Sequence, residues 1–252
     1  MFTTAFTVLL LLAILMMGPG CSQDSSLNST GGLNRVAAVD ATGNEPTFVA
    51  TFDDRINPGN WTFFEEPTMQ FEHFEQKDGN PGDFLHCEFC RRKGGLVGHV
   101  VKLRTQLGVS SVFTGDYRAR QVSRVGADLG FFPDFPIQSD DRPLCVSLTY
   151  DNGTPADTTD DLVAMYKGNR DIPMDNGIWM KYEFDVPSES TTLPDGWEIF
   201  MGSGAGDDVD WNTIITNVSS LGYVFGDPDK YWDYDFQLWD VGLDNPRIWY
   251  GE

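Results

Sequence analysis

The chain has 252 residues, of which 13% are aromatic and 22% are charged. This aromatic content indicates a packed globule and excludes a disordered chain. The net charge of −21 argues against a nucleic-acid partner or an anionic lipid surface, because both repel an acidic protein.

The first 20 residues have the pattern of a signal peptide. The apolar run at 8–17 is shorter than the roughly 20 residues that cross a bilayer, and small residues follow it. Gly18-Pro-Gly-Cys21 resembles a bacterial lipobox, in which the cysteine becomes the lipidated first residue. The alternative is ordinary secretion with cleavage near Gly20. Both interpretations predict export from the cytoplasm. The lipobox interpretation also predicts that a lipid on Cys21 anchors the protein to the membrane.

The rest of the chain divides into a linker and a domain. Residues 21–45 are rich in Ser, Asn, Gly and Thr, a composition typical of a flexible tether. Residues 46–252 fit one all-β domain, because sandwiches of roughly 200–250 residues form single units. We therefore predict a signal peptide at 1–20, a tether at 21–45 and a β-sandwich at 46–252.

From Pro46 onward, short alternating runs are separated by Gly, Pro, Asn and Asp clusters, which predicts antiparallel strands. The alternation predicts that Tyr182 and Phe184 are buried, whereas Glu183 and Asp185 face solvent. Expected strands are 48–52, 61–63, 84–86, 96–107, 109–113, 116–129, 144–150, 162–166, 179–186, 198–201 and 223–225.

One helix is expected over about 210–221. Asp210 is a favourable N-cap residue, and Gly222 is suited to end the helix. The apolar residues between them recur at helical spacing; these are Trp211, Ile214, Ile215, Val218 and Leu221.

The final segment, 235–249, predicts the closing strands of the sandwich. Its apolar residues change parity, which requires a bulge or break, expected at Leu238–Asp240. We predict that this segment lies beside the opening strand at 47–54, so that Phe52 and Ile248 belong to neighbouring strands. The fold class is thus all-β, a two-sheet antiparallel jelly-roll sandwich with one short helix.

Several short motifs follow one another along the chain: Phe52-Asp53, Gly115-Asp-Tyr117, Ile178-Trp-x-x-Tyr182, the 211–221 helix and Leu243-Asp-Asn245. Their order resembles the laminin type IV (laminin B) domain and the jelly-roll carbohydrate-binding modules, over roughly residues 47–250. The resemblance implies adjacent terminal strands and a structural Ca²⁺ near them.

Calcium ligands are expected where the two ends of the domain meet. Asp53 or Asp54 would pair with Asp244 there, since Ca²⁺ prefers carboxylate oxygens. The alternative is that these residues serve turns and caps, where Asp is common.

The cysteines predict one disulfide, but the sequence does not determine which two cysteines form it. If Cys21 carries lipid, Cys87, Cys90 and Cys145 remain, and an exported protein meets oxidising conditions. Free thiols and a metal site that adds His86 are the alternatives.

The basic residues are concentrated in one segment. Residues 91–124 hold eight Lys and Arg against Asp116, a local charge of +7 that leaves −28 for the rest. We interpret these cations as partners of acidic loops, and an anionic ligand is the alternative.

Sugar binding requires exposed aromatic rings beside polar groups, and the candidates are Trp61, Tyr231, Trp232 and Tyr234. A glycosidase is not predicted, because Glu183-Phe-Asp-Val-Pro-Ser-Glu189 is one residue too long for a Glu-x-Asp-x-x-Glu strand motif and contains a proline.

The first hypothesis is therefore a non-catalytic cell-envelope lipoprotein whose jelly-roll module binds a glycan. The second is a structural or adhesive domain that binds an extracellular protein, and the third is a glycoside-active enzyme. An exposed aromatic platform with polar neighbours favours the first, and a flat polar surface with every Trp buried favours the second. Two carboxylates roughly 5–10 Å apart in a cleft favour the third.

Overall fold

A computed structural model describes residues 45–53, 56–64, 73–80, 82–90, 101–132, 143–171, 177–225 and 239–251. Cys21 and the predicted signal peptide lie outside these ranges. No helix within them is long and apolar enough to cross a membrane.

The described residues form strands and one α-helix. The elements are β1 (Phe48–Val49), β2 (Trp61–Phe64), β3 (His73–Gly79), β4 (Gly82–Cys90), β5 (Val101–Thr105), β6 (Arg124–Phe131), β7 (Pro143–Tyr150), β8 (Leu162–Asp171), β9 (Ile178–Asp185), β10 (Trp197–Met201), α1 (Asp207–Thr216), β11 (Ser220–Phe225) and β12 (Trp239–Trp249).

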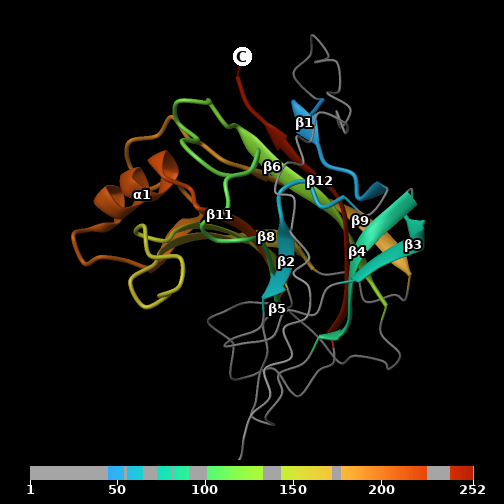
Figure 1. Ribbon diagram of the computed structural model, residues 1–252. Helices are drawn as coiled ribbons and strands as arrows, with labels where there is room; N and C mark the ends of the chain where they lie inside the picture. Colours follow the sequence, from blue (N-terminus) through green and yellow to red (C-terminus); the bar gives the residue numbers. More distant parts are fainter. Residues whose placement is uncertain are drawn as a thin grey trace, which may run out of the picture. The chain divides into compact units, whose positions relative to one another are not determined.

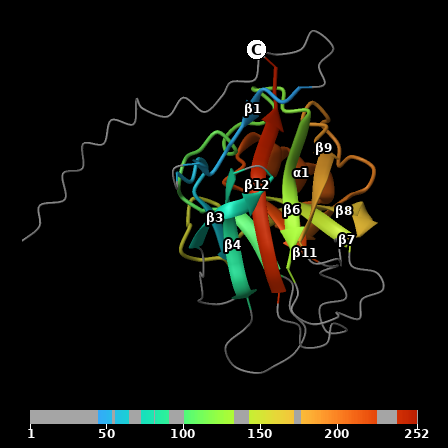
Figure 2. The same cartoon turned by 90° about the vertical axis from the view of Figure 1, so that its right-hand side faces the viewer.

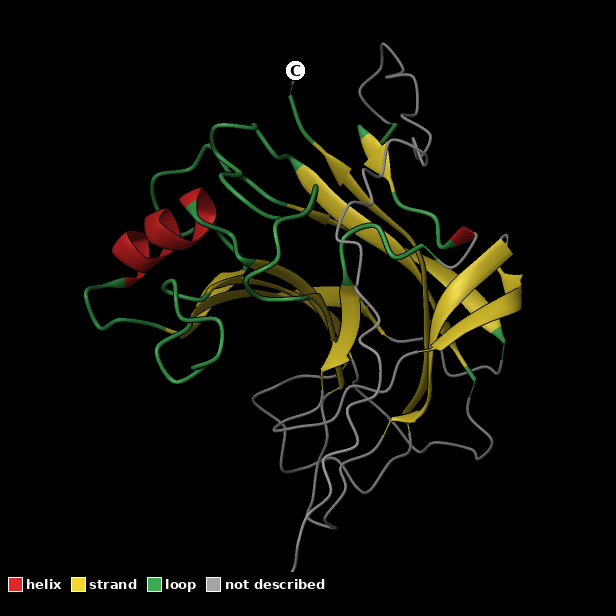
Figure 3. Ribbon diagram, in the orientation of Figure 1, coloured by secondary structure: helices red, strands yellow, loops and turns green. Residues whose placement is uncertain are grey.

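The strands build two antiparallel sheets, which confirms the predicted two-sheet sandwich (Figures 1 and 3). The β12 sheet has the order β3-β4-β12-β6-β9, and β1 also pairs with β12. The β11 sheet has the order β10-β8-β7-β11-β5-β2. Figure 2 shows β12 between β4 and β6, with β3 and β9 beyond them.

The two ends of the domain meet as predicted. Phe48 of β1 is the register partner of Ile248 on β12, and Val49 is the partner of Arg247. Phe52 follows β1 and is fully buried in the same core as Ile248. The last strand is therefore held on both sides, by β4 and β6, and at its end by the first strand.

The predicted break in the final segment is confirmed within the described residues. The register of β12 against β4 shifts between Trp239 and Val241, which leaves Asp240 out of the ladder. Leu238 lies outside the described residues. A second shift against β6 falls between Asp244 and Arg247, next to the site described below.

The predicted helix exists, but both of its ends were wrong. It begins after the N-cap Gly206, whereas Asp210 lies inside the helix and accepts hydrogen bonds from the N–H of Ser203 at 2.9 Å and from its hydroxyl at 2.5 Å. It ends at Thr216, and Leu221 belongs to β11. Leu221 is buried because β11 enters the core there. Its position in the sequence happens to match the helical spacing of the apolar residues before it, so the predicted helix was too long.

One predicted strand is absent from the described residues, and another is shorter than expected. Val109–Phe113 forms turns and loop, and the expected strand over 116–129 begins at Arg124. The backbone N–H of Val122 bonds to the carbonyl of Tyr117 instead of a neighbouring strand. Short-range turn bonds therefore replace the ladder that the apolar residues suggested.

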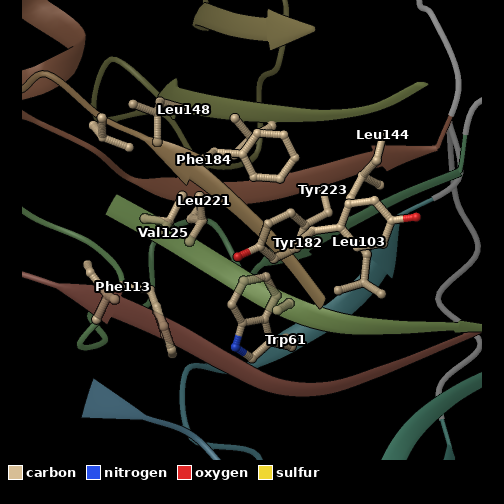
Figure 4. Close-up of a cluster of buried hydrophobic side chains, with 14 of the residues drawn as sticks. Trp61, Leu103, Phe113, Val125, Leu144, Leu148, Tyr182, Phe184, Leu221 and Tyr223 are labelled. Carbon is tan, nitrogen blue, oxygen red and sulfur yellow. The ribbon is translucent and has the colours of Figure 1, made fainter. Parts of the chain in front are cut away.

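The core lies between the inner faces of the two sheets (Figure 4). Phe184 of β9 and Tyr223 of β11 come from opposite sheets, and their ring centroids are 6.2 Å apart. Trp61 of β2 stacks on Tyr223 at 5.6 Å. The alternation predicted for β9 is confirmed, because Tyr182 and Phe184 are buried while Glu183 and Asp185 are on the exposed side.

Candidate functional site

The outer face of the β12 sheet carries a row of rings and glycines across four strands. The register pairs Trp179 of β9 with Gly130 of β6, Gly130 with Gly242 of β12, and Gly242 with His86 of β4. Alternation places all four on the face opposite the core, since their neighbours Leu129, Val241 and Leu243 are in the core cluster.

Four side chains on this face form an aromatic platform: Phe84, His86, Phe132 and Trp179. The ring centroids of Phe84 and Trp179 are 5.0 Å apart, and those of Phe132 and Trp179 are 5.7 Å apart. His86 lies 5.3 Å from Phe84 and 5.5 Å from Phe132. Phe84 is 3% exposed, whereas the other three rings are half-buried. An aromatic group on the solvent face of a sheet is unusual, because that face is normally polar.

Glycines make room for the platform. A Cβ atom on Gly242 would lie 2.7 Å from the Phe84 ring, and one on Gly130 would lie 2.9 Å from the Phe132 ring. The rings therefore lie directly against the strand backbones. Glycine inside a strand often marks such a close approach.

The next row on this face is charged. Lys181 of β9 pairs in register with Asp128 of β6, and Asp128 pairs with Asp244 of β12. The Arg247 guanidinium forms an ion pair with Asp128, and both residues are buried, at 8% and 6% exposure. The platform thus has charged side chains beside it that can donate and accept hydrogen bonds.

Asp244 is the most perturbed group in this row. Its side chain is 1% exposed, and one oxygen accepts the N–H of Asn80 at 2.6 Å. Burial raises its pKa to about 6; the N–H groups of Asn80 and Asn245 oppose the rise, and the charges of Asp128 and Asp53 add to it. The carboxylate therefore has a raised pKa chiefly because it is buried, and the two neighbouring carboxylates contribute less.

The structure brings two of the three predicted calcium ligands near each other. A Cβ on Gly82 would lie 2.6 Å from Asp53, and one on Gly79 would lie 3.1 Å from Asp244, so both carboxylates face the ends of the β3–β4 hairpin. Asp54 lies outside the described residues. Within the described ranges, no three Asp, Glu, His or Cys side chains gather as a metal site. An ion there would need backbone oxygen, and the candidate is the Asn80 carbonyl, which accepts a hydrogen bond from Asn245, because the N–H of the same residue binds Asp244.

None of the four rings of the aromatic platform was among the predicted sugar-binding aromatics. Trp61 is 0% exposed and packs in the core, so it presents no ring face to a ligand. Tyr231, Trp232 and Tyr234 lie outside the described residues. Trp179 was missed, although its parity with Glu183 and Asp185 already placed it on the solvent face.

The cysteine predictions stay predictions. Cys87 and Cys90 lie on β4, and Cys145 lies on β7 of the other sheet, fully buried against Met165 and Val224.

Three described cations of the basic segment, Arg118, Arg120 and Arg124, have intramolecular partners. Arg124 contacts Glu183 at 3.4 Å and Asp185 at 3.2 Å, as the interpretation of paired charges expects. Arg118 instead donates to the carbonyls of Ser188 and Ser190. No described feature of this segment indicates an anionic ligand.

No family model matches the sequence, and no curated protein matches it. Among solved structures, the fold is similar to an exo-β-agarase with a TM-score of 0.43 and 12% identity, covering 80% of this chain and 25% of that one. A carbohydrate-binding module specific for non-crystalline cellulose has a TM-score of 0.35 and 15% identity, covering 81% of this chain and 94% of that chain. The protein SGBP-B from a xyloglucan utilization locus of Bacteroides uniformis has a TM-score of 0.34 and 11% identity, with 82% and 52% covered. At these TM-scores the similarities carry no argument about function.

Proposed function

We propose that this protein is an exported, non-catalytic module that binds a glycan on the outer face of the β12 sheet. The observation that carries the proposal is the aromatic platform with its charged neighbours. Aromatic rings offer flat apolar faces to the C–H groups of a sugar ring, and adjacent Asp, Asn, Lys and Arg side chains bind hydroxyl groups. Lys181, which is exposed, supplies such a group one row away.

The protein-binding alternative has less support. It expected a flat polar surface with every Trp buried, whereas Trp179 is half-buried within the aromatic platform. The rings of the platform lie against the glycine backbones of β6 and β12, and flat apolar ring faces suit the C–H groups of a sugar.

Catalysis is not proposed for the carboxylate pair on β9, because its surroundings are wrong. Glu183 and Asp185 alternate on β9, which places them about 7 Å apart, within the range of glycosidases. Such enzymes need two carboxyl groups in different environments, so that one keeps its proton. Here both carboxylates contact the same Arg124 guanidinium, and the Asp185 side chain is 84% exposed.

A structural Ca²⁺ ion is part of the proposal. Asp53, Asp244 and the carbonyl oxygen of Asn80 would hold it, because Ca²⁺ prefers hard oxygen donors. The support is the proximity of the two carboxylates: burial is the main cause of the raised pKa of Asp244, and the charge of Asp53 is close enough to add to that rise. The ion would supply neutralising charge at the junction of the two chain ends. The expected result is a higher melting temperature in Ca²⁺ than in EDTA. Equal melting temperatures in the two conditions, measured at low ionic strength, would count against the ion.

The proposal also includes attachment to the cell envelope through a lipid on Cys21. The resemblance to laminin B domains remains part of the same proposal. The variant Cys21→Ser is expected to move the protein from the membrane fraction to the soluble fraction. If it stays with the membrane, the lipobox interpretation is wrong.

The function is tested by screening the full chain on a glycan array in the presence of Ca²⁺. Binding to at least one glycan, lost in Trp179→Ala, is the expected result. Phe200→Ala is a matched control, because Phe200 is 43% exposed and lies on β10 of the other sheet. The absence of binding to any glycan would end the proposal.

A further inference from the structure

A cleft of about 530 Å³ lies at the edge of the sandwich, between β9 of one sheet and β8 and β10 of the other. This volume is within the range of small-molecule sites, about 300–1,000 Å³. The residues used below that line it are Tyr166, Lys181, Glu183, Asp185, Asp195 and Trp197. β9 is the last strand of its sheet in the described part of the chain, so the cleft follows the free side of that strand.

Tyr166 and Trp197 give the cleft an aromatic wall. Their ring centroids are 5.8 Å apart, and Tyr166 is half-buried while Trp197 is 6% exposed. Gly196 has a φ of +82°, and a Cβ there would lie 2.7 Å from the Tyr166 ring. The Tyr166 ring thus rests directly on the backbone of the turn before β10, which fixes its position.

The edge cleft adjoins the aromatic platform along β9. Trp179 belongs to the platform, and Lys181, two residues further on the same face, lines the cleft. A strand rises about 3.3 Å per residue, so these two residues are about 7 Å apart and Trp179 is about 20 Å from Asp185. A chain-like ligand on Trp179 that follows β9 therefore passes Lys181 and enters the cleft.

The charges of the cleft indicate an uncharged ligand. The Lys181 ammonium contacts Glu183 at 2.5 Å, and Arg124 contacts Glu183 and Asp185, so the two carboxylates on β9 have cationic partners. Asp195 is exposed, and none of the described residues forms an ion pair with it. The uncompensated charge of the cleft is thus negative, as is that of the chain at −21, and a polyanion would be repelled.

We propose that the platform and the edge cleft bind successive parts of one uncharged linear oligosaccharide that lies along β9. This inference rests on the proposed glycan binding and adds the ligand class: a neutral chain of several sugars, and not a monosaccharide or an acidic polysaccharide. Trp179 holds one end of the bound segment, and Tyr166 and Asp195 hold the other.

The test is calorimetric titration of the full chain with two-unit and six-unit members of the cello-, xylo-, manno- and malto-oligosaccharide series. In one of these series, the six-unit ligand is expected to bind at least tenfold more tightly than the two-unit ligand. Tyr166→Ala and Asp195→Ala are expected to reduce that difference at least threefold without weakening the two-unit ligand. Asp195 is exposed, so its variant keeps the test valid if Tyr166→Ala fails to fold.

Each failure has a separate meaning. Three results would overturn the continuous site: equal affinity for the two-unit and six-unit ligands, equal losses of affinity for both lengths in the cleft variants, or binding of acidic glycans alone. In each case, binding that depends on Trp179 would leave the proposed function standing. If neither these series nor any array glycan binds, the proposed function itself fails. Phe200→Ala is expected to change none of the affinities.

Discussion

Replacing Asp244 with Asn should change how stability depends on pH. The side chain is buried at 1% exposure between Asp128 and the β3–β4 hairpin. Its pKa rises from 3.8 to about 6 on folding. Because the folded state binds this proton more tightly, the contribution of Asp244 to stability is full below pH 3.8 and is lost as pH rises through 6.

The size of the effect follows from the same values. A rise from 3.8 to about 6 corresponds to about 3 kcal/mol, at about 1.36 kcal/mol per pKa unit. Between pH 4.5 and pH 7.5 the wild type loses about 2 kcal/mol of this contribution, since part of the titration lies below pH 4.5. Asn does not titrate, so Asp244→Asn should lack this loss. The cost of the altered hydrogen bond from Asn80 is independent of pH and cancels between the two conditions.

Urea denaturation in EDTA at pH 4.5 and 7.5 measures the difference. The stability of Asp244→Asn relative to wild type should be about 2 kcal/mol more favourable at the higher pH. Asp185→Asn is the control, because that side chain is 84% exposed and an exposed ion pair contributes about 0–1 kcal/mol. If the pH dependence of Asp244→Asn equals that of wild type, burial does not raise the pKa of this carboxyl group.

Two further predictions concern β12. Ile248→Ala should cost about 2–5 kcal/mol in the free energy of unfolding, because Ile248 is fully buried opposite Phe48; a cost below about 1 kcal/mol would contradict the packing of the two ends. Arg247→Ala should cost about 3–5 kcal/mol, because it leaves Asp128 buried without its cation. Arg124→Ala removes a surface cation and should cost about 1 kcal/mol or less, and equal costs for the two arginine variants would refute the distinction.

Local alternation predicted much of the fold. In β9 it gave the burial of Tyr182 and Phe184 and the exposure of Glu183 and Asp185, because the side-chain period of a strand is fixed at two. The change of parity in the last segment likewise predicted the bulge near Asp240. These features depend on residues close in sequence, which a single chain displays directly.

The helix boundaries and the aromatic platform depend on tertiary contacts and were missed. Asp210 has the chemistry of an N-cap, but its carboxylate binds Ser203 across a loop that composition does not reveal. Trp179 has the parity of Glu183 and Asp185, but no prediction was drawn from it, and its gathering with Phe84 and Phe132 requires the register of β9, β6, β12 and β4. Register between distant strands leaves no mark in one sequence.

The most direct test of glycan binding is a comparison of the affinities of wild type, Trp179→Ala and Phe200→Ala for the best array glycan, by calorimetry. Truncating a central aromatic contact typically costs about 2 kcal/mol or more, which is about 30-fold in Kd. The proposal therefore predicts at least this loss for Trp179→Ala and none for Phe200→Ala. Unchanged affinity in Trp179→Ala, with the variant folded, would place the ligand elsewhere and contradict the account.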